Sequence, residues 1–148
     1  MATLEEEFSN FVKPPITPTL GRELRKFVFD FKNPDYKEVI SIRLKRLKYI
    51  KEQIRTQTNS VSTYQAMWGV YKHNPHLFIE DWGITYDPRK EFAIMPFMLF
   101  PRQKEYIQRL HYKWKNKEDF LVEKSRDMGL TWLNVAFAVW MITFHPNV

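Results

Sequence analysis

The sequence predicts a mostly helical N-terminal region that leads into the beginning of an α/β domain. Between residues 34 and 82, apolar residues recur at helical spacing and are bounded by residues that start or stop helices. Further along, a short apolar run at 120–122, a polar turn and a long apolar run at 131–144 follow one another. This order is typical of a buried strand, a loop and a buried helix.

Residues 1–33 are expected to form an N-terminal arm, because Pro14, Pro15 and Pro18 favour an extended chain. A helix over 34–57 should follow, with Asn33 as its N-cap, Pro34 at its first position and Asp35 in its first turn. One apolar stripe at helical spacing runs along it, and four basic residues lie largely off this stripe. The stripe is Tyr36, Ile40, Leu44, Leu47, Ile50 and Ile54, and the basic residues are Arg43, Lys45, Arg46 and Lys48.

Two more helices complete the helical region, which we expect over residues 34–90. Ser60 or Ser62 can cap the first of them. The pair Asn74-Pro75 ends that helix and starts the next, which Gly83 can terminate. Residues 85–91 predict a turn, and residues 92–100 form at best a short strand because they contain Pro96.

Residues 91–148 are expected to be the beginning of an α/β domain. Pro101 can open a helix through Lys115, residues 116–119 form a polar turn, and 120–122 fit a buried strand. The helix at 131–144 is apolar on nearly every side, as in a large core. One strand and one helix do not complete a parallel sheet, so we expect the rest of the domain in a longer chain.

Composition narrows the class of protein. The chain has 148 residues, 44% of them hydrophobic and 16% aromatic, which argues against disorder. It has no cysteine, and its four histidines show no metal-ligand spacing, so we predict neither a disulfide nor a metal site built on side-chain nitrogen or sulfur. The acidic start MATLEEEFSN is not a signal peptide, and the longest apolar run is too short to cross a membrane, so a soluble intracellular protein without membrane contact is expected.

Positive charge is concentrated in two stretches. Residues 31–60 hold eight Lys/Arg against three Asp/Glu, and residues 101–148 hold eight against five. A basic excess favours a polyanionic partner. For residues 31–60 alone, a solvated helix face explains the charge equally well.

The turn before the last helix resembles a phosphate-binding loop. Residues 124–131 read KSRDMGLT, against the usual G-x-x-x-x-G-K-T. Gly129 and Thr131 match, whereas Leu130 stands where such loops carry lysine. Lys124 takes the first glycine position and Arg126 lies inside the loop, so either long side chain could supply the missing charge. By themselves these residues fit a nucleotide site and an incidental strand–turn–helix equally well.

Three segments together resemble a known family. "EDWGITYDPR" (80–89) and "MLFPRQKEYIQRL" (98–110) precede "LVEKSRDMGLTW" (121–132) in order. They are similar to the large subunit of tailed-bacteriophage terminases, the ATP-driven motor that packages DNA into procapsids. The resemblance covers about residues 74–144 and is strongest at FPRQ and EKSRDMGLTW.

This resemblance implies a P-loop NTPase fold and an ATP site with Mg²⁺. The implied phosphate loop is Lys124, Ser125, Arg126, Asp127, Met128, Gly129, Leu130 and Thr131, with Thr131 on the metal. Lys124 and Arg126 would act in catalysis, and Gln103 would pair with adenine through its amide.

The resemblance also implies a working context. The parent would be an ATPase with a C-terminal nuclease domain, acting as a homo-oligomeric ring on a procapsid in the host cytoplasm. Its partners would be double-stranded DNA, the small terminase subunit and the portal protein. This chain lacks the acidic strand, the catalytic glutamate and the nuclease carboxylates, so we expect it to be inactive alone. Two alternatives remain. The first is a non-catalytic helical module that binds DNA, the small subunit or the portal through 34–57 and 64–82. The second is an unrelated helical DNA-binding domain.

Overall fold

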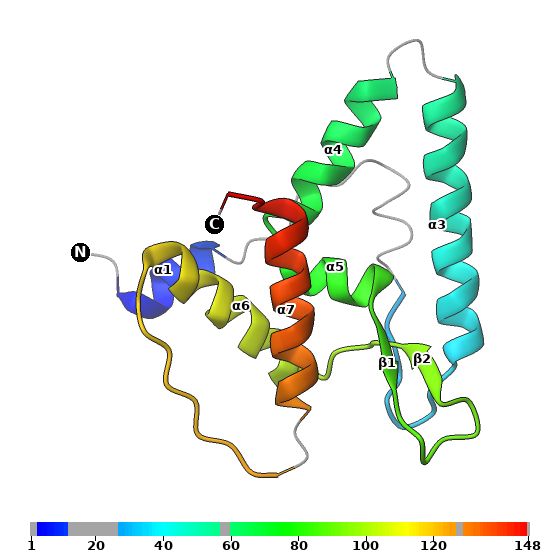
Figure 1. Cartoon of the computed structure of the whole chain (residues 1–148). Coiled ribbons are helices and arrows are strands. Elements are labelled where there is room, and N and C mark those ends of the chain that lie inside the picture. The colour runs from blue at the N-terminus through cyan, green and yellow to red at the C-terminus, as the bar shows by residue number, and fades with distance from the viewer. Residues whose placement is uncertain (1–2, 12–26, 57–59, 127–128, 148) are drawn as a thin grey trace.

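The computed structural model describes residues 3–11, 27–56, 60–126 and 129–147. Helices dominate this part of the chain, with one small antiparallel hairpin (Figure 1). The elements are α1 (Leu4–Phe11), α3 (Tyr36–Thr56), α4 (Ser60–Lys72), α5 (Pro75–Trp82), β1 (Ile84–Tyr86), β2 (Ile94–Pro96), α6 (Pro101–Asn116) and α7 (Leu130–Phe144).

Helix α7 lies at the centre and packs on α4, α5 and α6, while α1 covers α6 and α3 lies beside α4 and β2 (Figure 1). Trp140 of α7 and Ile107 of α6 are fully buried. The Trp140 indole nitrogen donates a hydrogen bond of 2.7 Å to the Tyr71 carbonyl, which fixes α7 on α4. The core therefore draws on both sides of the boundary expected at residues 90 and 91. Its members are Val70, Tyr71, Leu77, Ile79, Phe97, Leu99, Ile107, Leu133, Phe137, Trp140 and Phe144.

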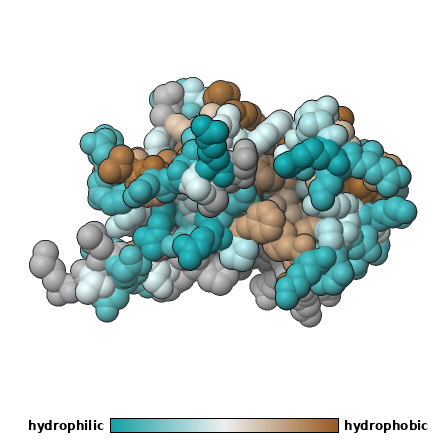
Figure 2. Space-filling model, turned by 90° about the horizontal axis from the view of Figure 1, so that it is seen from below, coloured by the Kyte–Doolittle hydropathy of each residue, from teal (hydrophilic) through white to brown (hydrophobic). Residues whose placement is uncertain are grey.

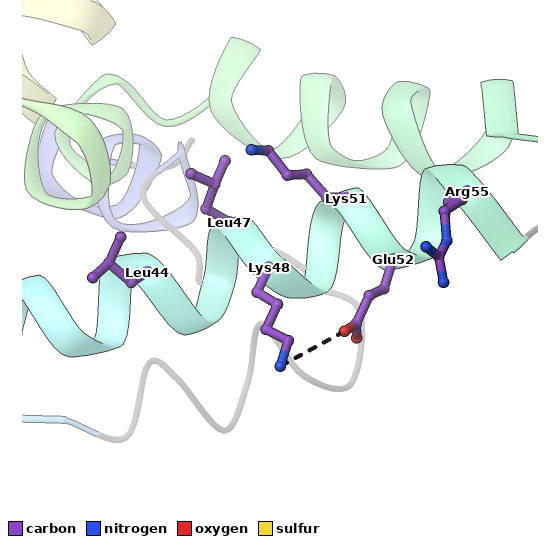
Figure 3. A pocket seen from close by; sticks show the side chains of 6 residues that line it. All are labelled: Leu44, Leu47, Lys48, Lys51, Glu52 and Arg55. Carbon is purple, nitrogen blue, oxygen red and sulfur yellow. Dashed lines mark ion pairs between the residues drawn. The ribbon is translucent and has the colours of Figure 1, made fainter.

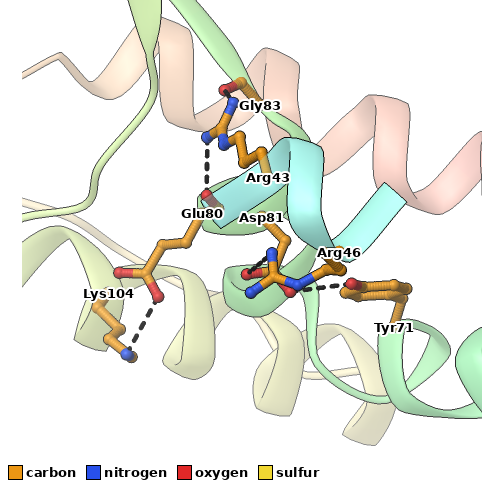
Figure 4. A network of polar contacts seen from close by, with 7 residues as sticks. All are labelled: Arg43, Arg46, Tyr71, Glu80, Asp81, Gly83 and Lys104. Atoms are coloured by element: carbon orange, nitrogen blue, oxygen red, sulfur yellow. Dashed lines mark hydrogen bonds and ion pairs between the residues drawn. The ribbon is translucent and has the colours of Figure 1, made fainter. Parts of the chain in front are cut away.

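A buried polar network joins α3, α4 and α5 (Figure 4). The Arg46 guanidinium lies 2.8 Å from the Asp81 carboxylate, and the Tyr71 hydroxyl donates to the same carboxylate at 2.9 Å. Arg43 donates to the carbonyls of Gly83 and Glu80 at 2.8 and 2.7 Å. Burial lowers the pKa of Arg43 to about 10, so it stays charged at neutral pH.

This network corrects the prediction for α3. The helix turns Val39, Arg43 and Arg46 inward, whereas most of the predicted apolar stripe is exposed. The two arginines face the core because their hydrogen-bond acceptors lie there, on α5 and at its C-terminal end. Both side chains are therefore bonded inside the molecule and are not part of a solvated basic face.

The two N-terminal helices start differently from the prediction. Residues 4–11 of the expected arm form helix α1, because Thr3 and Glu6 make a capping box: the Glu6 amide donates to the Thr3 hydroxyl and the Thr3 amide to the Glu6 carboxylate. Helix α3 starts at Tyr36 with Asp35 as its cap, since the Glu38 amide donates to the Asp35 carboxylate at 2.9 Å. Asn33 is therefore not the N-cap.

The helices from α5 onward match the prediction closely. Helix α5 runs from Asn74 as its cap to Gly83, α6 begins at Pro101, and α7 occupies the predicted apolar run. A glycine is needed at Gly83 because a Cβ there would lie 2.5 Å from the Ile79 carbonyl oxygen. In the predicted turn 85–91, however, Thr85 and Tyr86 belong to strand β1, which pairs with β2 in the register Thr85 to Met95.

Residues 120–122 do not form the predicted strand. A strand needs a neighbour for its backbone hydrogen bonds, and no described residue pairs with this segment. Phe120 instead stacks on Tyr106, with ring centroids 5.7 Å apart, and the Leu121 side chain is 96% exposed.

None of the helices in the described part of the chain combines the length and the apolar character needed to cross a membrane.

We expect Arg46→Met to lower the free energy of unfolding by about 3–5 kcal/mol, because it leaves Asp81 buried without its ion pair. Urea unfolding followed by circular dichroism measures this. Adding Asp81→Asn, which still accepts from Tyr71, should recover more than half of the loss. Lys45→Met, on the exposed side of the same helix, is the matched control and should change little. A small effect of Arg46→Met would contradict the structural role of the pair.

We also expect the stability to fall on acidification because of His111. Its pKa is lowered to about 3, mainly by burial and also by the nearby positive charge of Lys115 and by His145 and His73. Below the pKa of about 6.5 in the unfolded chain, the His111 imidazole binds a proton when unfolded but stays neutral when folded. This difference in proton binding favours the unfolded state. Between pH 7 and pH 5, His111→Phe should lose about 1–2 kcal/mol less than the parent in urea unfolding. An identical pH dependence would exclude His111 as the source.

Candidate functional site

Gly129 lies within the predicted loop and is the N-cap of helix α7. Its backbone is left-handed, with φ of 70° and ψ of 15°, a conformation that glycine adopts without strain. The Leu133 amide donates to the Gly129 carbonyl at 3.1 Å, which closes the first turn of α7. Thr131 is exposed in this turn. The first amides of a helix lack intrahelical partners, so this end of α7 suits an anion.

Gln103, predicted to contact adenine, lies beside Gly129. Its amide nitrogen is 3.2 Å from the position that a Cβ on Gly129 would occupy. Its amide oxygen accepts a hydrogen bond of 3.1 Å from the Phe100 backbone and so caps helix α6. The structure therefore brings together the predicted adenine contact and the predicted phosphate loop, which are far apart in sequence.

Tyr106, which the sequence prediction did not include, connects the parts of this site. Its hydroxyl donates to the Asn134 side-chain oxygen of α7 at 2.6 Å, and its ring stacks on Phe120 just before the loop. Burial raises the pKa of Tyr106, although its bond to Asn134 partly offsets this. Because Tyr106 follows Gln103 by three residues on α6, helical spacing could have placed both on one face.

The predicted loop cations are available to a ligand. Lys124, Ser125 and Arg126 are exposed. Within the described residues, neither Lys124 nor Arg126 forms an ion pair, including with the neighbouring Glu123. Two further predicted loop residues, Asp127 and Met128, lie outside the described residues.

Two other features of a phosphate site are the residue in the usual lysine position, Leu130, and the acidic groups that could hold a metal ion. Leu130 is half-buried against the core, so the residue in the usual lysine position points inward and serves packing. In the described part of the chain, no three His, Asp or Glu side chains lie close enough to hold a metal ion. The predicted metal contact is thus a single hydroxyl, that of Thr131.

Exposed apolar residues lie along α7 and near the loop and hairpin. The side of α7 away from the core exposes Trp132, Val135, Val139 and Ile142. Leu121 is exposed before the loop, and so are Ile84 and Ile94 on the hairpin. Seen from below, separate apolar patches lie between hydrophilic side chains (Figure 2). Apolar surface of this kind marks places where another structure packs.

Gly129→Ala should destabilise the chain by about 1–2 kcal/mol, because alanine is strained in the left-handed conformation and its methyl group would press on Gln103. Gly69→Ala is the matched control. Nothing lies within 4 Å of a Cβ at this position inside α4, so it should stabilise the chain by about 0.5–1 kcal/mol. Urea unfolding compares the two variants, and equal effects would contradict the assigned geometry of Gly129.

No family model, curated protein or solved structure matches this chain. The resemblance to terminases therefore remains a prediction from the three quoted segments. Any functional conclusion depends on the residues around Gly129 and on their geometry.

Proposed function

We propose that Gln103 and residues 124–131 form an ATP site, and that the chain is part of a DNA-packaging motor of the terminase large-subunit type. The main support is the position of Gln103, whose amide nitrogen lies 3.2 Å from where a Cβ on Gly129 would stand. An incidental strand–turn–helix would have no reason to place a glutamine amide against its glycine. An ATP site requires the two groups to lie in the same region, since adenine and the phosphates belong to one ligand.

The loop would hold the phosphates by backbone and side-chain charge together. The amides at the start of α7 and the helix dipole attract the phosphate oxygens. Lys124 would act mainly in binding, as a point charge on the β-phosphate. Arg126 would act mainly in catalysis, because its planar fork can bridge γ-phosphate oxygens as their charge develops. This distribution would replace the lysine that is absent at Leu130.

Mg²⁺ would bind through the Thr131 hydroxyl, which is exposed in the first turn of α7. When bound, the ion neutralises phosphate charge and orients the terminal phosphate. Thr131 would hold the ion at the helix start, two residues after the glycine.

Gln103 would distinguish adenine from guanine. Its amide oxygen can accept from N6 of adenine while its nitrogen donates to N7. The oxygen already accepts from the Phe100 amide, and a carbonyl oxygen has a second lone pair for the base. The same bond fixes the direction of the amide before any ligand arrives, which lowers the entropic cost of binding.

The exposed apolar side of α7 also supports the motor proposal. In an ATPase domain of this class, the helix after the phosphate loop packs on the strands of a sheet. Both the α7 face and Leu121 are open to such strands. Double-stranded DNA is the proposed substrate of the motor, and the positive net charge of +6 is compatible with it.

We expect Gln103→Glu to weaken ATP binding by about 1–3 kcal/mol and to abolish the preference for ATP over GTP, because glutamate cannot donate to N7. It still accepts from the Phe100 amide, so helix α6 should keep this cap bond. Fluorescence anisotropy with a labelled ATP in Mg²⁺, competed by ATP or GTP, measures both affinities. Unchanged ATP and GTP affinities would exclude Gln103 from the base contact.

Lys124→Ala provides the control in the same titration. It removes a phosphate contact, so it should weaken ATP and GTP equally and leave their ratio unchanged. If the parent chain binds no labelled ATP, or if Lys124→Ala binds it as tightly as the parent, the proposed site is wrong.

A further inference from the structure

One flank of α3 exposes apolar side chains in a regular order. Ile40, Leu44, Leu47 and Ile54 are 46%, 60%, 37% and 42% exposed, respectively. With Lys51 they follow one another at spacings of four, three, four and three residues. This is the heptad pattern that helices use to pack in a coiled coil. We call these five residues the α3 seam.

The seam is not the most buried side of α3, although α3 also packs on α4. That side carries Val39, Arg43 and Arg46, which are turned toward α5 and the hairpin. On the helical wheel the seam lies next to this inward side, and Lys48 and Arg55 border it on the outer side. It is therefore a second apolar surface on the same helix.

The surroundings of the seam are positively charged. A hollow of about 360 Å³ beside α3 is lined by Leu44 and Leu47, by the three cations Lys48, Lys51 and Arg55, and by Glu52 (Figure 3). Lys48 and Glu52 are 4.0 Å apart and both exposed, so this pair is weak. Three cations against one carboxylate leave the hollow with a net positive charge.

We propose that the α3 seam binds an acidic, amphipathic helix of a partner protein by coiled-coil packing. The apolar members would receive the partner's apolar side chains. Lys48 and Arg55 occupy heptad positions that pair with charges on a partner helix, and Lys51 stands at a core position where lysine selects among partners. The partner helix should therefore have leucine-like residues at its core positions and glutamate or aspartate beside them.

Two other occupants fit the seam less well. A second copy of this chain would place the cations of one α3 against the cations of the other, and like charges at these positions oppose pairing. DNA would contact the cations but would leave Leu44, Leu47 and Ile54 without an apolar surface to bury them. The acidic helix satisfies the charges and the apolar residues together.

The experiment uses two synthetic helical peptides of about three heptads, both with leucine at the core positions. One has glutamate at the flanking positions and the other has lysine. Each is labelled and titrated with the full chain by fluorescence anisotropy. The acidic peptide should bind, more weakly as salt is raised, and the basic peptide should bind at least about tenfold more weakly.

Two variants locate the binding. Leu44→Glu with Leu47→Glu should abolish binding of both peptides, and because both side chains are exposed, the fold should persist by circular dichroism. Lys48→Glu, Lys51→Glu and Arg55→Glu together should reverse the preference from the acidic to the basic peptide. The control is Val135→Glu with Ile142→Glu, an equal change on exposed apolar positions of α7, which should bind the acidic peptide like the parent.

Several outcomes would overturn the proposal. These are equal binding of the two peptides, no binding of the acidic one, or binding that survives the Leu44 and Leu47 substitutions. The surface would be assigned to nucleic acid by another result. In that case a labelled DNA duplex binds the parent but not the charge-reversal variant, and the acidic peptide does not bind. A dimer in analytical ultracentrifugation that Leu44→Glu dissociates would assign it to a second copy.

Discussion

The arrangement of the helices depends on the buried carboxylate of Asp81. This group forms an ion pair with Arg46 of α3 and accepts a hydrogen bond from Tyr71 of α4. Its own helix, α5, packs on α6 and α7. A carboxylate is too costly to bury without such partners. Alternative packings of α3 or α4 would therefore leave it unpaired, and this penalty favours the observed arrangement.

Helix α5 also connects this network to the candidate site. The Glu80 carbonyl accepts from Arg43 of α3, while its side chain pairs with Lys104 of α6 at 3.2 Å (Figure 4). Lys104 follows Gln103 in the first turn of α6, where the Gln103 side chain accepts the cap bond from the Phe100 amide. The first turn of α6 is thus held by the Lys104–Glu80 pair, and the glutamine amide in it is oriented by its bond to Phe100.

The sequence predicted well those features whose causes are local. Proline and glycine signals predicted the ends of α5 and the start of α6, and the apolar run at 131–144 predicted α7, although one side of this helix is exposed. Helix α1 had a local signal too, the Thr3 and Glu6 capping box, which the three later prolines obscured. Strand β1 was missed because its three residues are stabilised by their partner strand and not by their own pattern.

Other features have causes that lie far apart in sequence. The inward orientation of Arg43 and Arg46 follows from acceptors nearly forty residues away, so the spacing of apolar residues on α3 indicated the wrong inward side. In the candidate site, the residue types of the loop and Gln103 were predictable from the motif and the resemblance. The approach of Gln103 to Gly129 and the role of Tyr106 required the fold.

The continuous core across residues 90 and 91 has a consequence for how this chain can evolve. Tyr71 and Ile79 precede that point, and Trp140 and Phe137 follow it, yet they share one interior. Recombination that exchanged the first helices for those of a relative would join surfaces that had not diverged together. Substitutions on the two sides should therefore accumulate in compensating pairs, and the helical region should be inherited together with the loop that follows it.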